Sequence, residues 1–413
     1  MQEAKMIMEA QNKFGWKQWR KFFNDIHLWL GIASGIVLFI VCLTGTIYTF
    51  KQEVEELFAP SLYKVNPTEG SIALPTDELA QKVAQETGGQ VTSISIPQDK
   101  KKSYSISVKT SENERRGTSY FVNQYTAEVL GVQDASVSDF FLTVMKLHRW
   151  LLIEGDTGKI IVGISTIIFI FLTLTGMVIW FPIKLKNWKQ GLKIKMNANW
   201  KRINHDLHNT LGFYSFFLLL IMGLTGLCWS FGWYKDGLSK IMGSEVFGAR
   251  REKPMTSIVP EHLEDAKVMS ISHYIAVTDS LLPYPGNYRI SIPSSPEGSV
   301  SVTKSKNGFF AIASSDRVQI DQYSGLPLKV ERFSDKALNE QIVSLIRPLH
   351  TGEVMGMFSK ILYFLACLFA TSLPVTGTII WINKLKKKKK KRGKELYKKN
   401  SIRNDKQEAV LAE

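Results

Sequence analysis

Cysteine is scarce in this chain of 413 residues: there are three, Cys42, Cys228 and Cys367, and all lie within apolar stretches. The polar regions therefore hold no disulfide, and the lack of any CxxCH motif excludes covalently attached haem. GxGxxG and Walker patterns are also absent, so the chain has no recognisable nucleotide-binding machinery. Any electrons from a nicotinamide or flavin cofactor would have to be supplied by another molecule.

Charge is nearly absent from four long apolar stretches, in which Lys360 is the exception. They cover residues 28–50, 160–181, 210–231 and 357–382. Each is long enough to cross a hydrocarbon layer of ~30 Å, which takes about 20 residues. Buried helices of a soluble protein would show a polar face, which these lack. We therefore predict four membrane-spanning helices. The first has no cleavage site after it, so we expect it to remain as an anchor.

Basic residues produce a net charge of +15 and predict the orientation of the chain. They gather before the first stretch, between the second and third, and after the fourth, where 386–391 is an unbroken lysine run. The positive-inside rule then puts both termini in the cytoplasm and the two long loops outside it. The lysine run lies next to a membrane helix, so we expect it to bind lipid headgroups rather than nucleic acid.

The two halves of the chain repeat each other. Matching pieces are 24–31 with 205–212, 43–45 with 224–226, 122–126 with 320–324, and Thr175-Gly176 with Thr376-Gly377. Each half reads helix, outer domain, helix, which predicts a tandem parallel repeat. The Thr-Gly pairs inside the spans are most simply explained by close packing between helices.

The predicted fold class is an α-helical bundle of four transmembrane helices with two α+β domains outside the cytoplasm. Its predicted parts are the N-terminus (1–26), first helix (27–50), first outer domain (51–142), second helix with an outer extension (143–182), basic loop (183–204), third helix (205–231), second outer domain (232–344), fourth helix with an outer extension (345–382) and basic tail (383–413). A helical period marks 76–87, and strand-like alternation marks 91–96, 104–108, 119–122, 288–292, 299–303, 309–313 and 318–320.

Five of the seven histidines lie at the entrances of the predicted membrane helices: His27, His205 and His208 on the cytoplasmic side, His148 and His350 on the outer side. The other two, His262 and His273, show no partner pattern. Imidazoles from two helices can clamp one haem iron between them. The repeat pairs His27 with His208 and His148 with His350, which predicts one candidate haem near each membrane face. His205 could replace His208 as the ligand or hydrogen-bond to it from outside.

The neighbours of these histidines suit a flat porphyrin. Gly31 and Gly212 follow His27 and His208 by four residues, which leaves a patch without side chains on the same helix face. Gly35 extends this patch, and Phe216 takes the matching place in the third helix. Cations for haem propionates lie close to the histidines in sequence: Arg149, Arg347, Arg20, Lys21 and Arg202.

Two other interpretations compete with haem. A histidine at a helix end can cap the helix or reach the headgroups, although four at matched positions favour a shared role. A Zn²⁺ or Fe²⁺ site is the second; it lacks carboxylates beside His148 and His350, but Asp25 and Asp206 leave it open for the inner set.

These motifs resemble the PepSY-associated transmembrane family, also called iron-regulated membrane proteins. The resemblance rests on LHRWL at 147–151, HDLHNTLG at 205–212, PLHTG at 348–352 and two hairpins at 123–131 and 321–325, and it covers about 14–385. The first hairpin departs from the family by Ala127, where glycine is common. Some members of this family are di-haem reductases of the bacterial inner membrane that reduce ferric siderophores in the periplasm, whereas others have no assigned activity.

The resemblance implies that His27, His148, His208 and His350 are axial ligands of two haem b groups, with no catalytic residue assigned. Our leading hypothesis is an oxidoreductase that carries electrons from an unidentified donor to ferric iron in a siderophore or to another periplasmic acceptor. The alternative is a non-enzymatic membrane-anchored protein that binds a peptide or protease through PepSY domains. An iron or haem permease comes third, because the spans carry few polar groups near their middle. The residues do not specify the acceptor or the oligomeric state.

Overall fold

The computed structural model describes residues 16–411 except 112–113, 115–116, 183, 249–253 and 262–266, so His262 lies outside the described residues. The chain forms two compact units. The helical unit contains the described residues up to Thr46, Leu147–Ser230 and those from Leu365 onward. The sheet unit contains Ile47–Lys146 and Phe231–Phe364.

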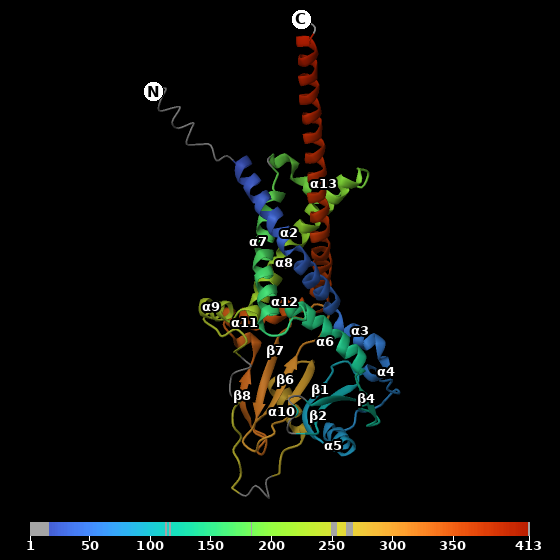
Figure 1. The fold of residues 1–413 in the computed structure, drawn as a ribbon. Coiled ribbons are helices and arrows are strands. Elements are labelled where there is room, and N and C mark those ends of the chain that lie inside the picture. The colour runs from blue at the N-terminus through green and yellow to red at the C-terminus, as the bar shows by residue number, and fades with distance from the viewer. Residues whose placement is uncertain are drawn as a thin grey trace, which may run out of the picture. The chain divides into compact units, whose positions relative to one another are not determined.

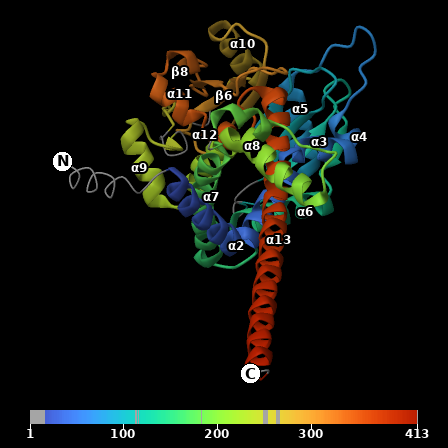
Figure 2. The same cartoon turned by 90° about the horizontal axis from the view of Figure 1, so that it is seen from above.

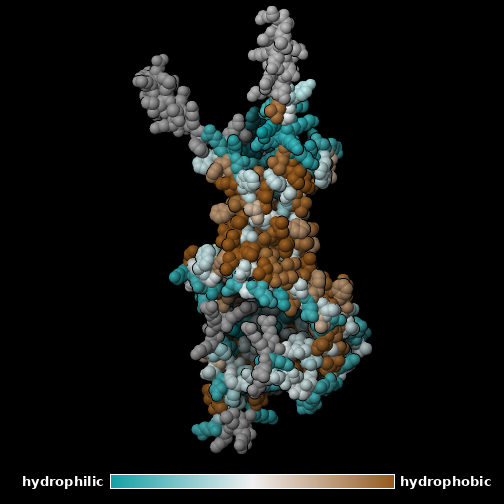
Figure 3. All heavy atoms as spheres, in the orientation of Figure 1, coloured by the Kyte–Doolittle hydropathy of each residue, from teal (hydrophilic) through white to brown (hydrophobic). Residues whose placement is uncertain are grey.

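The helical unit is built on α2 (Trp16–Thr49), α7 (Asp156–Trp180), α8 (Trp200–Ser230) and α13 (Gly356–Leu411), which lie side by side (Figures 1 and 2). In the described part of the chain, these four helices are long and apolar enough to cross a membrane. Figure 3 shows a band of mostly hydrophobic residues around the middle of this unit and hydrophilic residues at one end of it. Large apolar side chains point outward, such as Ile36 (78% exposed) and Phe217 (67%). The chain is therefore a multi-pass membrane protein whose solvent is partly the lipid bilayer.

Three of these helices extend well beyond their predicted apolar stretches, and the first is α2, which begins at Trp16 rather than at residue 28. The helix α8 begins ten residues earlier, at Trp200, and α13 runs on through the lysine run to Leu411. Lysine is a good helix former, so the basic tail continues the helix rather than ending it. The loop before α8 contains a short 3₁₀ helix, η1 (Leu185–Leu192).

The segment before α7 is a separate helix, α6 (Ala135–Trp150). It begins inside the predicted first outer domain and ends two residues after His148. The break between α6 and α7 falls at Leu151 and Leu152, whose φ angles of +56° and +59° are strained for residues other than glycine. His148 is thus held on its own helix and not on the membrane span that follows.

The sheet unit contains, among the described residues, one antiparallel sheet of eight strands in the order β4-β3-β2-β1-β5-β6-β7-β8 (Figure 1). The strands are β1 (Gln90–Ile96), β2 (Tyr104–Lys109), β3 (Thr118–Val122), β4 (Val129–Val132), β5 (Asn287–Ser291), β6 (Val300–Ser305), β7 (Ser315–Ile320) and β8 (Pro327–Glu331). The predicted outer domains therefore share one sheet, joined where Ile94 of β1 pairs with Ile290 of β5. This pairing removes two exposed strand edges, each of which would otherwise invite association with another chain.

Helices α5 (Thr76–Thr87) and α10 (Ile271–Leu281) pack against the sheet. The α5 bounds coincide with the predicted helix, because Leu79 and Val83 point into the core and are fully buried. The remaining elements are α3 (Lys51–Phe58), α4 (Pro60–Tyr63), α9 (Gly232–Met242), η4 (Phe333–Asp335), α11 (Leu338–Ser344) and α12 (Ile346–Thr351).

The two hairpins that carry part of the family resemblance make matching hydrogen bonds. Asn123 N donates to Glu128 O, and Asp321 N donates to Leu326 O, each at 2.9 Å. Ala127 adopts φ +56°, close to the +69° of Gly325 in the other hairpin. The turn is therefore kept without glycine, at a steric cost of about 1–2 kcal/mol for a left-handed residue.

The predicted strand over 309–313 is wrong. Phe309 and Phe310 form a turn, and only Ile312 makes an isolated bridge, to Met355. Apolar residues gather here for another reason: the Phe310 ring lies 5.1 Å from that of Phe358, at the start of α13. The apolar residues of this segment therefore serve an aromatic contact and not a half-buried strand. No helix or strand predicted from the sequence corresponds to α10, β4 or β8.

Candidate functional site

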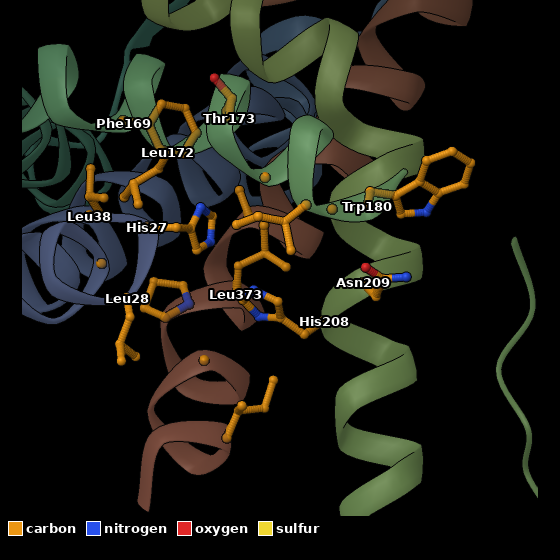
Figure 4. Close-up of a pocket in the computed structure, with 18 of the residues that line it drawn as sticks. His27, Leu28, Leu38, Phe169, Leu172, Thr173, Trp180, His208, Asn209 and Leu373 are labelled. Atoms are coloured by element: carbon orange, nitrogen blue, oxygen red, sulfur yellow. The ribbon is translucent and has the colours of Figure 1, made fainter. Parts of the chain in front are cut away.

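A cavity of about 240 Å³ lies among α2, α7, α8 and α13, within the helical unit. Its walls are mostly apolar, and they include Leu38, Phe169 and Leu219. A single water molecule needs only about 10–15 Å³, so a far larger ligand can enter. Among the polar groups are two histidines, His27 from α2 and His208 from α8, which enter the cavity from different helices (Figure 4). An apolar cavity with a few convergent polar groups is the usual form of a cofactor site.

The rings of His27 and His208 face each other with centroids 6.2 Å apart and planes at 89°. A metal ion sits about 2 Å from an imidazole nitrogen. That nitrogen lies roughly 1.1 Å from the ring centre, given ring bonds of about 1.35 Å. Two imidazoles that share one ion therefore have centres roughly 6 Å apart. The observed spacing fits two imidazoles that share one metal ion, and it is too long for a hydrogen bond between the rings.

Each of these histidines is oriented by a threonine. Thr175 Oγ1 lies 3.0 Å from His27 Nδ1, and Thr376 Oγ1 lies 2.9 Å from His208 Nδ1. Each hydroxyl already donates its single proton to the backbone carbonyl four residues earlier, at 2.7 and 3.0 Å. The hydroxyl must therefore accept a proton from the ring, so Nδ1 carries the ring proton. A neutral imidazole of this form presents an unprotonated Nε2, the atom that binds a metal.

A glycine follows each threonine and makes room for the ring. A Cβ added at Gly176 would lie 3.3 Å from His27 Cε1, and one added at Gly377 would lie 3.3 Å from His208 Cε1. These separations are tighter than an ordinary van der Waals contact, so an alanine would push the imidazole away. The Thr-Gly pairs therefore hold histidines, a role that our explanation of helix packing missed. Their repetition in the sequence was the signal that could have shown it.

The predicted glycine patch lines the same cavity. Gly31, Gly212 and Phe216 all contribute to its wall. Added Cβ atoms at Gly31 and Gly212 would meet only leucine side chains, at 3.8 and 4.0 Å. Space beside both histidines is thus kept open by the absence of side chains, as a flat macrocycle would need. The donor set, the ring spacing and this open patch all fit a haem.

His205 does not face His27. Its side chain is 59% exposed and lies 3.6 Å from Asp206, whose carboxylate also pairs with Arg202 at 2.8 Å. The structure therefore brings His208, and not His205, to the ring of His27, although His205 also borders the cavity. Arg202 was a candidate for a propionate, but its guanidinium is engaged by Asp206.

Other predicted cations have different surroundings. Arg20 donates to the carbonyl of Ile179, a residue of the cavity wall, at 2.7 Å, and its buried Nε has no hydrogen-bond partner within the described part of the chain. Arg149 lies over the Trp150 ring at 4.9 Å, and burial lowers the pKa of its guanidinium. Lys384, which sequence reasoning missed, is exposed and lines the cavity. Lys384 and Arg20 are therefore the cations best placed for an acidic ligand there.

His148 has the same kind of setting as the cavity histidines. Its Nδ1 lies 2.9 Å from Val41 O and 3.2 Å from Thr44 Oγ1, and an added Cβ at Gly45 would lie 3.2 Å from its Cε1. Because a carbonyl only accepts, Nδ1 carries the proton here too. His350 and Arg347 lie on α12 in the sheet unit, whereas His148 belongs to the helical unit. The pairing of His148 with His350 stays a prediction.

Two features bear on the rival interpretations. Across the described residues, no three or more His, Cys, Asp or Glu side chains gather as a metal-ion site would require. Lys360, the charge within the fourth apolar stretch, is 6% exposed and donates to both carboxylate oxygens of Glu53, at 2.7 and 2.9 Å. This buried charge is therefore paired, as charges at membrane depth usually are.

The comparisons with known proteins agree with the architecture. A family model described as the PepSY-associated TM region matches residues 25–384. A search of curated proteins found no match. The matched range includes His27, His148, His208 and His350.

Proposed function

The chain belongs to the PepSY-associated transmembrane family, and we propose that it is a haem b protein of the bacterial inner membrane that carries electrons to a ferric acceptor in the periplasm. Both termini would lie in the cytoplasm, on the basis of the basic segments that flank the spans. The sheet unit would lie in the periplasm. The acceptor that fits the family best is ferric iron in a siderophore, and the donor would be a reductant of the cytoplasm or membrane.

The observation that carries this proposal is the His27–His208 pair. Two imidazoles face each other across an apolar cavity at 6.2 Å, and each has its Nδ1 engaged by a threonine. A structural histidine needs no partner histidine at that spacing, nor a cavity beside it. Haem bound between these rings would supply a one-electron centre that cycles between ferric and ferrous iron.

The residues of the cavity have separate tasks in this proposal. His27 and His208 keep the ring proton on Nδ1 and so present Nε2. Leucine and phenylalanine side chains exclude water, which favours electron transfer over side reactions. Lys384 and Arg20 would bind propionates by charge. No residue needs to act as a general acid or base, because the proposed reaction moves an electron alone.

The periplasmic end of the route would use His148 and His350, the pair assigned by the sequence repeat. A ferric siderophore would accept the electron near the sheet unit. Ferrous iron is less charged and softer than ferric iron, so it is bound less tightly by hard oxygen ligands and is released. The permease alternative gains nothing from the structure, since the one charge in the apolar stretches is paired with Glu53.

Electron transfer across a membrane can be measured in vesicles. The purified chain is reconstituted with a ferric chelate trapped inside and a membrane-impermeant reductant outside, and ferrous iron is followed with a chromogenic chelator. We expect formation of ferrous iron that depends on the chain, with empty vesicles as the background.

The control is the His148→Ala variant, which should bind less haem and lose transfer, whereas His273→Ala should behave like the wild type. A chain that binds haem but shows no transfer above empty vesicles would contradict the conduit. The peptide-binding alternative predicts neither haem nor transfer.

A further inference from the structure

We infer that the Thr-Gly dyads of the membrane helices are positioning devices, each assigned to one histidine, and that they set the tautomer and the rotation of that ring. Each dyad consists of a threonine that accepts the Nδ1 proton and a glycine against which the ring rests. This inference deepens the proposed function, and it rests on that function only where it concerns bound haem.

Three dyads show the arrangement with their side chains in contact. Thr44-Gly45 holds His148, Thr175-Gly176 holds His27, and Thr376-Gly377 holds His208, with Oγ1–Nδ1 distances of 3.2, 3.0 and 2.9 Å. An added Cβ at the three glycines would meet the ring Cε1 at 3.2, 3.3 and 3.3 Å. Independent packing contacts would not reproduce both separations three times.

In one dyad the backbone of the same helix turn adds a second acceptor. His148 Nδ1 lies 2.9 Å from the carbonyl oxygen of Val41, three residues before Thr44. The helix α2 therefore offers the His148 ring two acceptors at once, a carbonyl and a hydroxyl. Glycine at the next position lets the imidazole approach close enough to reach both, because no Cβ stands in the way.

The chemistry of the dyad predicts what it does to a metal. An acceptor on Nδ1–H makes the imidazole more basic, and a more basic ligand favours the ferric over the ferrous state. It also fixes the rotation of the ring about its ligand bond. The 89° between the planes of His27 and His208 would then follow from the directions of their two dyads.

A fourth Thr-Gly pair, Thr225-Gly226, stands at the sequence position that matches Thr44-Gly45. The repeat therefore predicts a positioning role for this pair as well.

The first test replaces the hydroxyl and keeps its shape. In Thr175→Val and Thr376→Val, we expect haem to stay bound and its midpoint potential to rise. Loss of one hydrogen bond of about 1 kcal/mol shifts the ferric–ferrous equilibrium about threefold to tenfold, which is about 30–60 mV at 59 mV per tenfold change. The electron paramagnetic resonance spectrum of the ferric protein should also change, because the ring is released. Thr175→Ser should restore the wild-type values.

The matched control is Thr166→Val. Thr166 lies on the same helix outside the cavity wall, and its hydroxyl bonds to Val162 O at 2.8 Å and not to a histidine. Its removal should leave potential and spectrum unchanged. Gly176→Ala should lower haem occupancy, whereas Gly237→Ala, where an added Cβ meets nothing within 4 Å, should not. Potentials that stay at the wild-type value in both threonine-to-valine variants would overturn the dyad.

A haem-free measurement separates this inference from the proposed function. ¹⁵N nuclear magnetic resonance of histidine-labelled protein prepared without haem reports which ring nitrogen carries the proton, with signals assigned by His→Gln variants. We expect the Nδ1–H form for His27, His148 and His208. The Nε2–H form at these residues would overturn the dyad even if haem binds, and the Nδ1–H form would support it even if haem does not.

Discussion

The sheet unit and the helical unit fill their interiors in opposite ways. In the sheet, Ile94, Ile106, Ile290, Val302 and Val318 are fully buried, and the two matching halves meet at the β1–β5 pair. In the helical unit, matching helices bring two histidines to a cavity of about 240 Å³. Protein interiors are otherwise packed as densely as organic crystals, so an apolar cavity of this size beside two histidines supports the proposed haem site.

Buried polar groups differ between the units in the same way. Lys304 of the sheet unit is 2% exposed, and its ammonium group is bonded to Asp279 at 2.5 Å and to Leu282 O at 2.9 Å. This set of bonds serves the fold. The histidines of the cavity have only Nδ1 satisfied by their threonines, which leaves Nε2 as the atom for an added ligand. The comparison teaches that Lys304 is paired within the fold, whereas His27 and His208 are arranged as the proposed haem site would require.

The largest expected effect separates two histidines on one helix. His208→Ala should remove about half of the bound haem, because two haems per chain are proposed and the cavity site would keep only one of its two histidines. His205→Ala should retain all of it, since the His205 ring is exposed and its Nδ1 lies 3.6 Å from the Asp206 carboxylate. Haem content per chain, measured after extraction, checks both. Equal loss of haem in the two variants would show that His208 has no greater role in haem binding than the exposed His205.

A core substitution should affect stability without affecting haem. Ile94→Ala removes a fully buried side chain where β1 meets β5 and should lower the free energy of unfolding of the sheet unit by about 2–5 kcal/mol. Denaturant unfolding in detergent measures this loss. Under conditions where the variant is folded, its haem content should equal that of the wild type. A parallel loss of haem would show that the two units are not independent.

The sheet unit should contribute to the loss of folding stability at acidic pH. Burial raises the pKa of Asp321, but backbone N–H groups of Ile258, Tyr323 and Ser324 donate to its carboxylate and lower the pKa below its usual value overall. A depressed folded pKa gives stability that is present above the unfolded pKa of about 3.9 and lost as the pH falls through the folded value. Asp321→Asn should cost about 1–3 kcal/mol at neutral pH.

Thermal unfolding of the wild type and of Asp321→Asn, compared from neutral pH down to pH about 3, measures this contribution. The difference between the two proteins should shrink as the pH falls. A difference that stays constant with pH would mean that the carboxylate charge of Asp321 contributes no stability.

The smallest effect is expected at Arg202. Its side chain is half exposed and pairs with Asp206, so Arg202→Gln should change stability by no more than about 1 kcal/mol. Haem content should not change, whereas Lys384→Gln should weaken haem retention because Lys384 lines the cavity. Competition with an apo-globin that takes up released haem would rank the two variants. The reverse order would restore Arg202 as the propionate partner.

The sequence predicted the spans and the cavity histidines because both depend on short-range patterns. Twenty apolar residues can do little but form a helix in a membrane, and the repeat related His27 to His208. The open patch at Gly31 and Gly212 followed from the helical period alone. The α5 helix was predicted to the residue for the same reason, since Leu79 and Val83 mark its buried face.

Features that depend on long-range contacts were not predictable in this way. The β1–β5 pair joins residues almost 200 positions apart, and no local pattern shows that two domains will share a sheet. The apolar residues that support the contact of Phe310 with Phe358 gave a sequence pattern that resembles a strand. The role of Thr175 and Thr376 depends on which helix lies opposite, although their repeated spacing was visible. Likewise, only the three-dimensional structure shows that His208, and not His205, lies beside the His27 ring.

The central claim is that His27 and His208 hold a haem, and the optical spectrum of the purified chain tests it most directly. We predict a dithionite-reduced minus oxidised spectrum of b-type haem, with two haems per chain in the wild type and one when His27 and His208 are both replaced by alanine. A wild-type protein without a Soret band after expression with abundant haem, or a double variant that keeps two haems, would contradict it.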